Sequence, residues 1–255
     1  GHAFDGSVGP GEAVRIFTGA PVPDGADTIV IQENTEQSDE IVRVVDGTAP
    51  VGRYIRPAGL DFATGDVLLP RGKVLTARDV GLSAAMNVPW LSVHRKPRIS
   101  ILATGDEIVM PGDPIGRDQI VSSNALSLAA FITAQGGTPL DLGIAPDEED
   151  GLRALAAGAR GSDILVTTGG ASVGDHDLVQ SVLGDIGLKV DFWRIAMRPG
   201  KPLMFGRIDG TFLIGLPGNP VSSLVCAIMF LAPAIRKMLG VENLLPETGT
   251  ARLGS

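Results

Sequence analysis

The sequence contains few cysteines, few positive charges and no long uninterrupted apolar segment. Cys226 is the one cysteine among 255 residues, so an internal disulfide is excluded, and a reducing compartment such as the cytoplasm suits the chain. Lysine and arginine together number 21, against 29 aspartate and glutamate residues, and the net charge is −8. This charge excludes a general affinity for nucleic acids or acidic membranes, so any anion site must be local.

The most apolar stretch, residues 221–239, is interrupted by five residues that a membrane span avoids: Ser222, Ser223, Pro233, Arg236 and Lys237. A span needs roughly 20 largely apolar residues. The stretch therefore predicts a core helix.

Several common catalytic motifs are missing from the sequence. It contains no G-x-x-x-x-G-K-[ST] phosphate loop, no G-x-G-x-x-G dinucleotide fingerprint and no G-x-S-x-G nucleophile elbow. The three histidines, His2, His94 and His176, do not show the spacing of metal ligands.

A glycine-rich turn at residues 167–177 is the most informative stretch that is present. It follows an apolar, β-branched run at 163–166 and precedes apolar residues at helical spacing in 178–183, so it predicts a strand-to-helix turn. Its glycines allow backbone N–H groups to approach an anion, and Asp175 and Asp177 end the turn. This combination suggests a phosphate ligand held with a divalent cation. A plain turn with solvated acids remains the alternative.

The pattern along the chain predicts a β-rich domain followed by an α/β domain. Residues 1–60 are expected to be β-rich, with strands at 14–17, 28–31 and 41–45. Residues 61–96 are expected to form a short α+β connecting segment, with a strand at 66–70 and a helix that Thr76 caps. From 97 to 240, strands alternate with helices, which predicts a mostly parallel, doubly wound sheet.

In such sheets ligands bind beyond the carboxyl ends of the strands. Four turns follow predicted strands, at 104–107, at Asp147, at 167–177 and at 216–220, and we expect them at one edge of the sheet. They supply five acids, Asp106, Glu107, Asp147, Asp175 and Asp177, and three cations lie nearby, Arg194, Arg198 and Lys201. Acids and cations around a glycine-rich turn suit a phosphate ester and Mg²⁺. Each acid could instead be a solvated residue or one that interacts with a helix dipole.

Taken together, the motifs resemble those of the molybdopterin molybdenumtransferase (MoeA) family, which includes the gephyrin E domain. They are Thr-Gly-Asp-Glu at 104–107, Ser-Asn at 123–124, Gly-Gly at 169–170, Ser-Val-Gly at 172–174, Pro-Gly-Lys-Pro at 199–202 and Gly-Leu-Pro-Gly-Asn-Pro-Val-Ser at 215–222. The run at 15–23 resembles a loop of the family's β domain, and the resemblance extends from about Gly11 to Leu239.

The resemblance implies a MogA/MoaB-like α/β domain and insertion of molybdate into adenylylated molybdopterin, with release of AMP and dependence on Mg²⁺. It also implies a homodimer whose cleft is shared between subunits, and contacts with other cofactor-biosynthesis proteins are expected. The net charge, in turn, predicts no nucleic acid or membrane partner. The family's N-terminal helical segment would precede Gly1, and residues 241–255 would begin its C-terminal β domain. A chain without those segments is expected to insert molybdate poorly.

Residue by residue, the resemblance points to catalytic roles for Thr18, Asp61, Glu107, Asp147 and Asp177, with Glu107, Asp147 and Asp177 as metal ligands. The implied cofactor-binding residues are Thr104, Gly105, Asp106, Ser123, Asn124, Gly169, Gly170, Ser172, Gly174, Asp175, Arg194, Arg198, Lys201, Pro217, Gly218, Asn219 and Pro220. Two family lysines fall at Arg194 and Arg198, where a planar guanidinium replaces a compact ammonium. The family often carries glutamate where Asp175 stands.

Two other functions are considered. A related adenylyltransferase makes the substrate of this reaction, but its relatives usually show Thr-Gly after Gly-Gly, where this chain has Ala171-Ser172, and they lack the β domain with Thr18. A binding or scaffold module, as the gephyrin E domain also is, would need a partner groove. Binding of AMP and molybdate with Mg²⁺, or of a peptide alone, distinguishes these alternatives.

Overall fold

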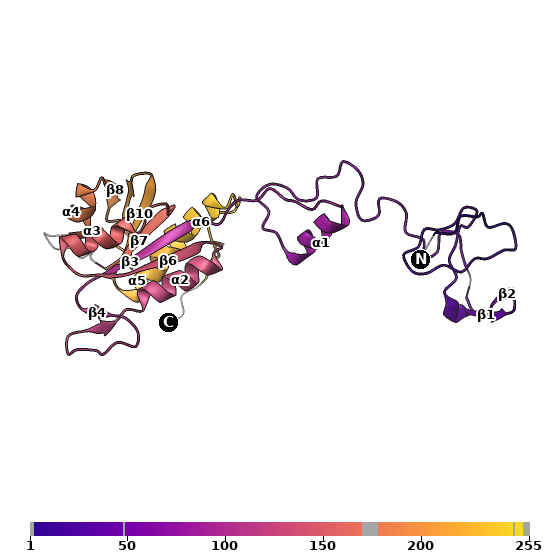
Figure 1. Ribbon diagram of the computed structural model, residues 1–255, viewed down its shortest axis with the longest axis horizontal. Coiled ribbons are helices and arrows are strands. Elements are labelled where there is room, and N and C mark those ends of the chain that lie inside the picture. The colour runs from indigo at the N-terminus through magenta and orange to yellow at the C-terminus, as the bar shows by residue number, and fades with distance from the viewer. Residues whose placement is uncertain (1–2, 48, 170–177, 247, 252–255) are drawn as a thin grey trace. The chain divides into compact units, whose positions relative to one another are not determined.

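The structure is a computed structural model, which describes residues 3–47, 49–169, 178–246 and 248–251 (Figure 1). The chain divides into two compact units, Gly1–Leu68 and Leu69–Ser255, called here the N-terminal unit and the C-terminal unit. The finer boundaries at residues 60, 96 and 240 stay predictions.

The N-terminal unit contains a short antiparallel hairpin. Strand β1 (Thr35–Ser38) pairs with β2 (Ile41–Val44), and a 3₁₀ turn, η1 (Gln32–Asn34), precedes them. Asp39 adopts a positive φ of 51° in the tight turn between the strands, a conformation that aspartate tolerates better than most residues. The strand expected at 41–45 is therefore confirmed as β2.

Three other expected strands, at 14–17, 28–31 and 66–70, are wrong. These residues form no strand, although they are rich in β-branched side chains. Phe17 and Val67 are largely exposed, so no packed sheet surface forms around them. A β-branched run becomes a strand only where another backbone segment accepts and donates its ladder hydrogen bonds.

Helix α1 (Ala77–Ala85) begins in the C-terminal unit at the expected N-cap, Thr76. Thr76 and Asp79 form a capping box, in which each side chain bonds the other residue's backbone N–H. The Lys73 ammonium lies 2.5 Å from Asp79 Oδ1, and this hydrogen bond, together with those from Thr76, lowers the pKa of Asp79 to about 2. The beginning of α1 is thus fixed by local chemistry.

The main feature of the C-terminal unit is a six-stranded sheet (Figure 1). Its strands are β3 (Arg98–Thr104), β6 (Thr138–Ala145), β7 (Ile164–Thr168), β8 (Lys189–Trp193), β9 (Met204–Ile208) and β10 (Thr211–Leu216), in the spatial order β6-β3-β7-β10-β9-β8. Strand β9 is antiparallel to both neighbours, and the other strands run parallel. The expected mostly parallel sheet is confirmed.

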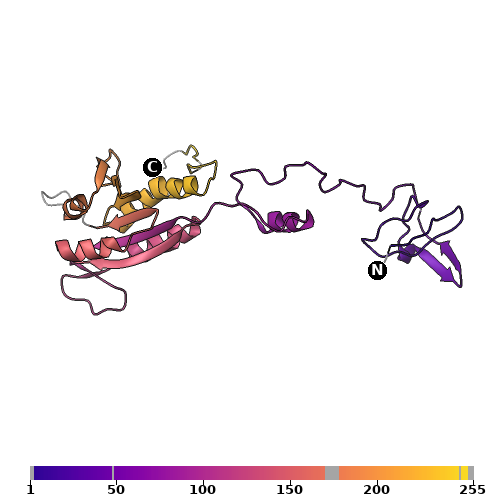
Figure 2. The same ribbon diagram turned by 45° about the horizontal axis from the view of Figure 1, so that its top comes forward.

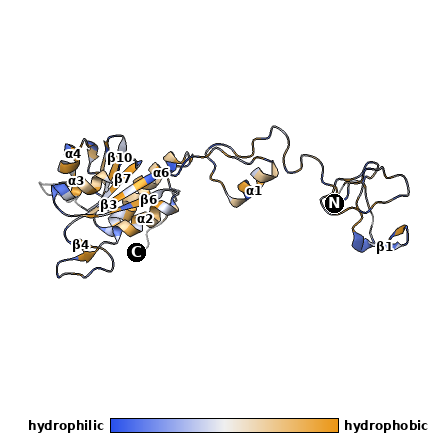
Figure 3. Ribbon diagram, viewed as in Figure 1, coloured by the Kyte–Doolittle hydropathy of each residue, from blue (hydrophilic) through white to orange (hydrophobic). Residues whose placement is uncertain are grey.

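Helices cover both faces of this sheet (Figure 2). Helix α2 (Asn124–Ala134) and the continuous helical segment α5 (Pro220–Cys226), η2 (Ala227–Leu231) and α6 (Ala232–Met238) pack on one face. Helices α3 (Glu149–Ala157) and α4 (Leu178–Asp185) pack on the other. Along β7, Ile164 and Val166 face the first layer and Leu165 the second, so the doubly wound arrangement is also confirmed. The apolar colouring of the central strands in Figure 3 reflects this burial on both sides.

By length and composition, one helix in the described part of the chain, Pro220–Met238, could cross a membrane. In the fold it lies against the sheet, where Cys226, Ala227, Leu231 and Ile235 are fully buried. Burial raises the pKa of the Cys226 thiol. The helix is a core element, as its interrupted apolar sequence predicts.

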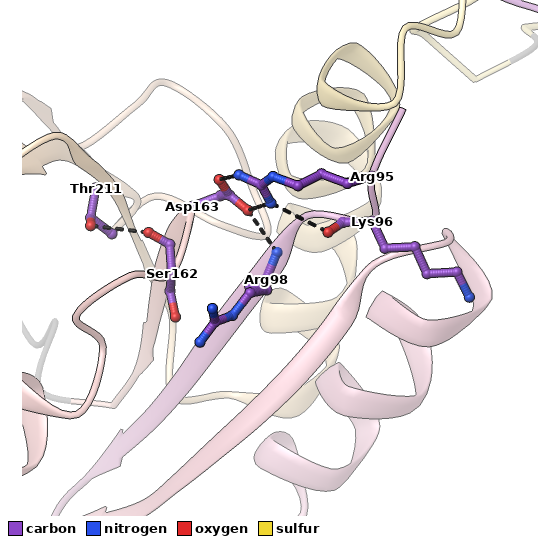
Figure 4. A network of polar contacts seen from close by, with 6 residues as sticks. All are labelled: Arg95, Lys96, Arg98, Ser162, Asp163 and Thr211. Carbon is purple, nitrogen blue, oxygen red and sulfur yellow. Dashed lines mark hydrogen bonds and ion pairs between the residues drawn. The ribbon is translucent and has the colours of Figure 1, made fainter. Parts of the chain in front are cut away.

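At the amino-terminal ends of β3 and β7, a hydrogen-bond network joins the segment before β3 to the beginning of the neighbouring strand β7 (Figure 4). The Arg95 guanidinium donates two hydrogen bonds of 2.7 and 2.6 Å to the Asp163 carboxylate. The Arg98 backbone N–H donates a third, of 2.7 Å, to the same carboxylate. The Arg95 hydrogen bond holds the pKa of Asp163 below its usual range. Asp163 thus ties the beginning of β7 to the segment that leads into β3.

Replacing Asp163 by asparagine is expected to lower the free energy of unfolding of the C-terminal unit by about 1 kcal/mol at pH 7, since the Arg95 side of the pair is exposed. Because the folded-state pKa is depressed, the carboxylate stabilises above the unfolded pKa, and this contribution is lost as the pH falls through the folded value. Urea unfolding at pH 7 and at pH 3 should therefore show a deficit at pH 7 that shrinks in acid.

Asp185→Asn is the matched control, because Asp185 makes a long, exposed contact of 3.6 Å with Arg153. A deficit in Asp163→Asn that is equal at both pH values, or no larger than that of the control, would contradict the role of the charged pair.

Candidate functional site

The carboxyl ends of β3, β6, β7, β8 and β10 lie at one edge of the sheet. Thr168 is level with Ala103 of β3 and with Leu216 of β10, and Thr104 is level with Ala145 of β6. Since β8 and β10 are both antiparallel to β9, β8 also ends at this edge. The turns expected to gather, apart from the undescribed part of 167–177, do so.

A cleft of about 340 Å³ opens at this edge. Its lining comes from the end of β3 and the residues after it, from residues 120–123, from the beginning of α2, the end of β7 and the turn between β10 and α5: Ala103, Thr104, Glu107, Ile108, Ile120, Val121, Ser122, Ser123, Asn124, Thr168, Gly169, Gly218, Asn219 and Pro220. The structure thus brings together Thr104, Glu107, Ser123, Asn124, Gly169, Gly218, Asn219 and Pro220 from the sequence-based candidates.

Bare backbone forms one wall of the cleft. Gly169 has a φ of +90°, and a Cβ there would overlap the carbonyl oxygen of Thr104. A Cβ on Gly218 would lie 3.5 Å from the Cα of Gly169, so the turns after β7 and β10 nearly touch. Only glycine allows this approach at position 169, and it leaves peptide groups open to a ligand.

The helix beginnings beside the cleft are capped differently. Asn219 caps α5 by accepting a 3.1 Å hydrogen bond from the Ser222 backbone N–H, and Pro220 occupies the first helical position. Ser123 stands at the N-cap of α2, but its hydroxyl makes no capping bond. The Asn124 side chain instead donates to Thr168 Oγ1 at 2.9 Å and to the Gly218 carbonyl oxygen at 2.7 Å.

The acidic side chains at this edge differ in their contacts and in their position relative to the cleft. Asp106 Oδ1 accepts a 3.0 Å hydrogen bond from the Asp147 backbone N–H, so it holds the turn after β6 beside the turn after β3. Glu107 is exposed and lines the cleft, and its carboxylate lies close to Gly105. Asp147 is exposed but lies outside the lining.

The three candidate cations, Arg194, Arg198 and Lys201, lie in the connection from β8 to β9. All are exposed, at the same edge of the sheet as the cleft but not in its lining. The Arg194 guanidinium stacks over the Trp193 ring at 4.4 Å. Two backbone hydrogen bonds close the connection, from the N–H of Arg194 to Leu203 and from that of Ile195 to Lys201.

The remaining candidates divide into three groups. Thr18 and Asp61 are exposed residues of the N-terminal unit. Pro217 is buried directly before the lining residue Gly218. Five residues lie outside the described residues: Gly170, Ser172, Gly174, Asp175 and Asp177.

Sequence reasoning missed the wall formed by β4 (Ile108–Val109) and β5 (Ile120–Val121). These short strands pair in parallel, and the excursion between them, residues 110–119, projects away from the sheet (Figure 1). Ile108, Ile120, Val121 and Ser122 all reach the cleft. The repeated Ile-Val pair on either side of a proline- and glycine-rich stretch was the available signal.

The side-chain donors at this edge could bind Mg²⁺ only if a ligand supplied further oxygen atoms. Within the described ranges, no group of three or more histidine, cysteine, aspartate and glutamate side chains could hold a metal ion. Mg²⁺ usually takes one or two carboxylates and completes its shell with water and substrate phosphates. Glu107 and Asp147, exposed oxygen donors at this edge, fit that arrangement.

A doubly wound sheet with a glycine-walled cleft at its carboxyl edge defines an α/β ligand-binding domain. Residues 100–237 match the family described as a probable molybdopterin binding domain, and residues 1–87 match the MoeA N-terminal region, domains I and II. The chain therefore belongs to the MoeA family of molybdenum cofactor biosynthesis proteins.

Relatives of known name are similar over most of the chain. A molybdopterin molybdenumtransferase of Nostoc sp. is 39% identical over 238 residues, which cover 92% of this chain and 54% of the relative. One of Haemophilus influenzae is 35% identical over 232 residues, covering 91% and 57%. A solved MoeA protein from Pyrococcus horikoshii has a TM-score of 0.79 at 32% identity, covering 95% of this chain and 61% of that one. The chain spans little more than half the length of these relatives.

Proposed function

We propose that this chain contributes the nucleotide-binding cleft of a molybdopterin molybdenumtransferase, which inserts molybdate into adenylylated molybdopterin and releases AMP. The supporting observation is the cleft itself, whose lining combines the Glu107 carboxylate with the bare peptide groups around Gly169 and Gly218. It lies in a chain that is 39% identical to a protein named for that transfer. A homodimer, roles for Thr18 and Asp61, and a cytoplasmic location belong to the same proposal.

In this mechanism the cleft binds the pterin nucleotide against the glycine wall, the bare backbone at Gly169 and Gly218. The backbone around Gly169 and Gly218 accepts a flat or phosphorylated ligand without a side chain in the way. Ser123 keeps its hydroxyl free of helix capping, at the positive end of the 11-residue helix α2, and can donate to a phosphate oxygen.

Breaking the phosphate anhydride places negative charge on the departing AMP, and positive groups stabilise that charge. Bound Mg²⁺ would neutralise phosphate charge, and Glu107 and Asp147 would hold it, with Asp177 as a further ligand. Arg198 and Lys201, exposed beyond β8, hold the molybdate anion. Arg198 presents a planar fork to the oxyanion, and Lys201 a compact charge.

Arg198→Ala is expected to weaken molybdate binding about tenfold, the loss of one charge-assisted contact, while the midpoint of thermal unfolding stays unchanged. Arg198→Lys should retain part of the affinity, because the charge survives and the fork does not. Isothermal titration of the chain with molybdate, in the presence of AMP and Mg²⁺, measures both. Arg117→Ala, in the exposed 110–119 excursion, is the charge-matched control, and equal affinity in the parent and Arg198→Ala would exclude this arginine.

The reaction itself is tested under single-turnover conditions, with the chain in excess over adenylylated molybdopterin. We expect AMP release that requires both molybdate and Mg²⁺. In a separate reaction that starts from molybdopterin and ATP, formation of the adenylylated pterin would indicate the adenylyltransferase instead. A chain that binds neither AMP nor molybdate would contradict the proposal.

A further inference from the structure

We propose that Asn124 is a positioning residue, which holds the two walls of the cleft together through its amide hydrogens. This inference rests on the proposed function only in taking the cleft as the ligand site. The family resemblance implied a ligand-binding role for Asn124; the contacts in the structure assign its nitrogen to the protein itself.

The contacts of Asn124 join three separate elements. Its side chain extends from the first residue of α2 to Thr168 Oγ1 at the end of β7, 44 positions away in the sequence. It also reaches the Gly218 carbonyl oxygen in the turn between β10 and α5, 94 positions away. All three residues line the cleft, so the side chain ties together three of the elements that form it.

The chemistry of the partners fixes which atom makes these bonds. A backbone carbonyl such as that of Gly218 can only accept a hydrogen bond, so the amide nitrogen of Asn124, and not its oxygen, must face it. The second amide hydrogen goes to Thr168 Oγ1, which leaves no hydrogen of Nδ2 for a ligand. The Oδ1 atom has no hydrogen-bond partner among the described residues, so it remains a free acceptor.

The two bonds control the position of the glycine wall. Thr168 directly precedes Gly169, and Gly218 lies against the Cα of Gly169. Gly218 also directly precedes Asn219, which caps α5. Because Thr168 is 2% exposed, water can replace the Asn124 bond to it only at a cost. Without Asn124, the turn after β10 can move away from the end of β7.

Asn124→Asp separates positioning from ligand contact, because it keeps the size and the oxygen acceptor and removes both donors. If Asn124 positions the walls, AMP in the presence of Mg²⁺ should bind about tenfold more weakly to Asn124→Asp and to Asn124→Ala at pH 8. AMP binding by Asn124→Ala that is as tight as that of the parent would overturn the proposal. Ser127→Ala, an exposed change on the same helix, is the control.

The pH profile gives a readout that a simple loss of packing does not. A carboxyl group facing two acceptors regains a donor when it is protonated. The ratio of the Kd values of Asn124→Asp and of the parent should therefore fall between pH 8 and pH 5, while the ratio for Asn124→Ala stays constant. A pH-independent ratio for Asn124→Asp would count against the hydrogen bonds as its cause.

A ligand-free measurement decides the inference even if AMP does not bind. The backbone N–H groups of Ser222 and Ser223 donate to Asn219, and their exchange should be about tenfold faster in Asn124→Ala and in Asn124→Asp at pH 8 than in the parent, and unchanged in Ser127→Ala. Absence of AMP binding to the parent would contradict the proposed function alone. Unchanged exchange in both Asn124 variants would overturn the positioning role.

Discussion

Replacing Gly169 by alanine is expected to destabilise the C-terminal unit by about 3 kcal/mol and to remove AMP binding. Two costs combine. A side chain at the φ of +90° costs about 1–2 kcal/mol. The overlap of its Cβ with the Thr104 carbonyl oxygen costs about 1–3 kcal/mol more, since this oxygen belongs to the backbone and cannot rotate away. Urea unfolding and titration with AMP and Mg²⁺ measure the two effects.

Gly161→Ala is the matched control. Gly161 also has a positive φ, of +78°, but a Cβ there would meet nothing within 4 Å. It should therefore lose only the conformational part, about 1 kcal/mol, and bind AMP normally. Equal losses in the two variants would show that the close approach of Gly169 to Thr104 contributes nothing.

Glu107→Gln is expected to slow molybdate-dependent AMP release by about 100-fold or more, because it removes a charge from the cleft and keeps the shape of the side chain. Stability should change by less than about 0.5 kcal/mol, since Glu107 is exposed. Affinity for AMP without Mg²⁺ should be unaffected, and the gain in affinity on adding Mg²⁺ should shrink.

Asp113→Asn provides the same change of net charge in the exposed excursion beyond the cleft. It should leave release and Mg²⁺-dependent affinity unchanged. Undiminished release in Glu107→Gln would remove this carboxylate from the reaction, and a loss shared by Asp113→Asn would point to the general field of the protein.

The sheet and its helices could be predicted from the sequence because burial on both faces leaves a clear pattern. In β7, Ile164, Leu165 and Val166 are all apolar, since the first and third face one helical layer and the second the other. The cap at Thr76 could be predicted for a different reason, because its hydrogen bonds are made within three residues.

The strands expected in the N-terminal unit show the limit of the same reasoning. Val14 and Phe17 have the side chains of a strand, but whether a segment pairs depends on a partner that local sequence does not specify. Conversely, β1 is polar throughout and forms because the turn at Asp39 folds it onto β2.

Much of the site could also be predicted, because residues after parallel strands meet at one edge wherever the chain lies between them. This rule brought Thr104, Gly169 and Gly218 together. It predicted neither the wall that β4 and β5 form nor the hydrogen-bond partners of the Asn124 side chain. Those depend on contacts between distant segments, which no local pattern encodes.

The strand order has a consequence for how the protein is made. Strand β10 lies between β7 and β9, and it is the last strand of the sheet to leave the ribosome. Until it is synthesised, β7 has an open, apolar edge, and Asn124 has no Gly218 to bind. A nascent chain ending before residue 216 therefore exposes a surface that favours aggregation and holds no finished cleft. A ligand of this cleft can therefore bind only after β10 has joined the sheet.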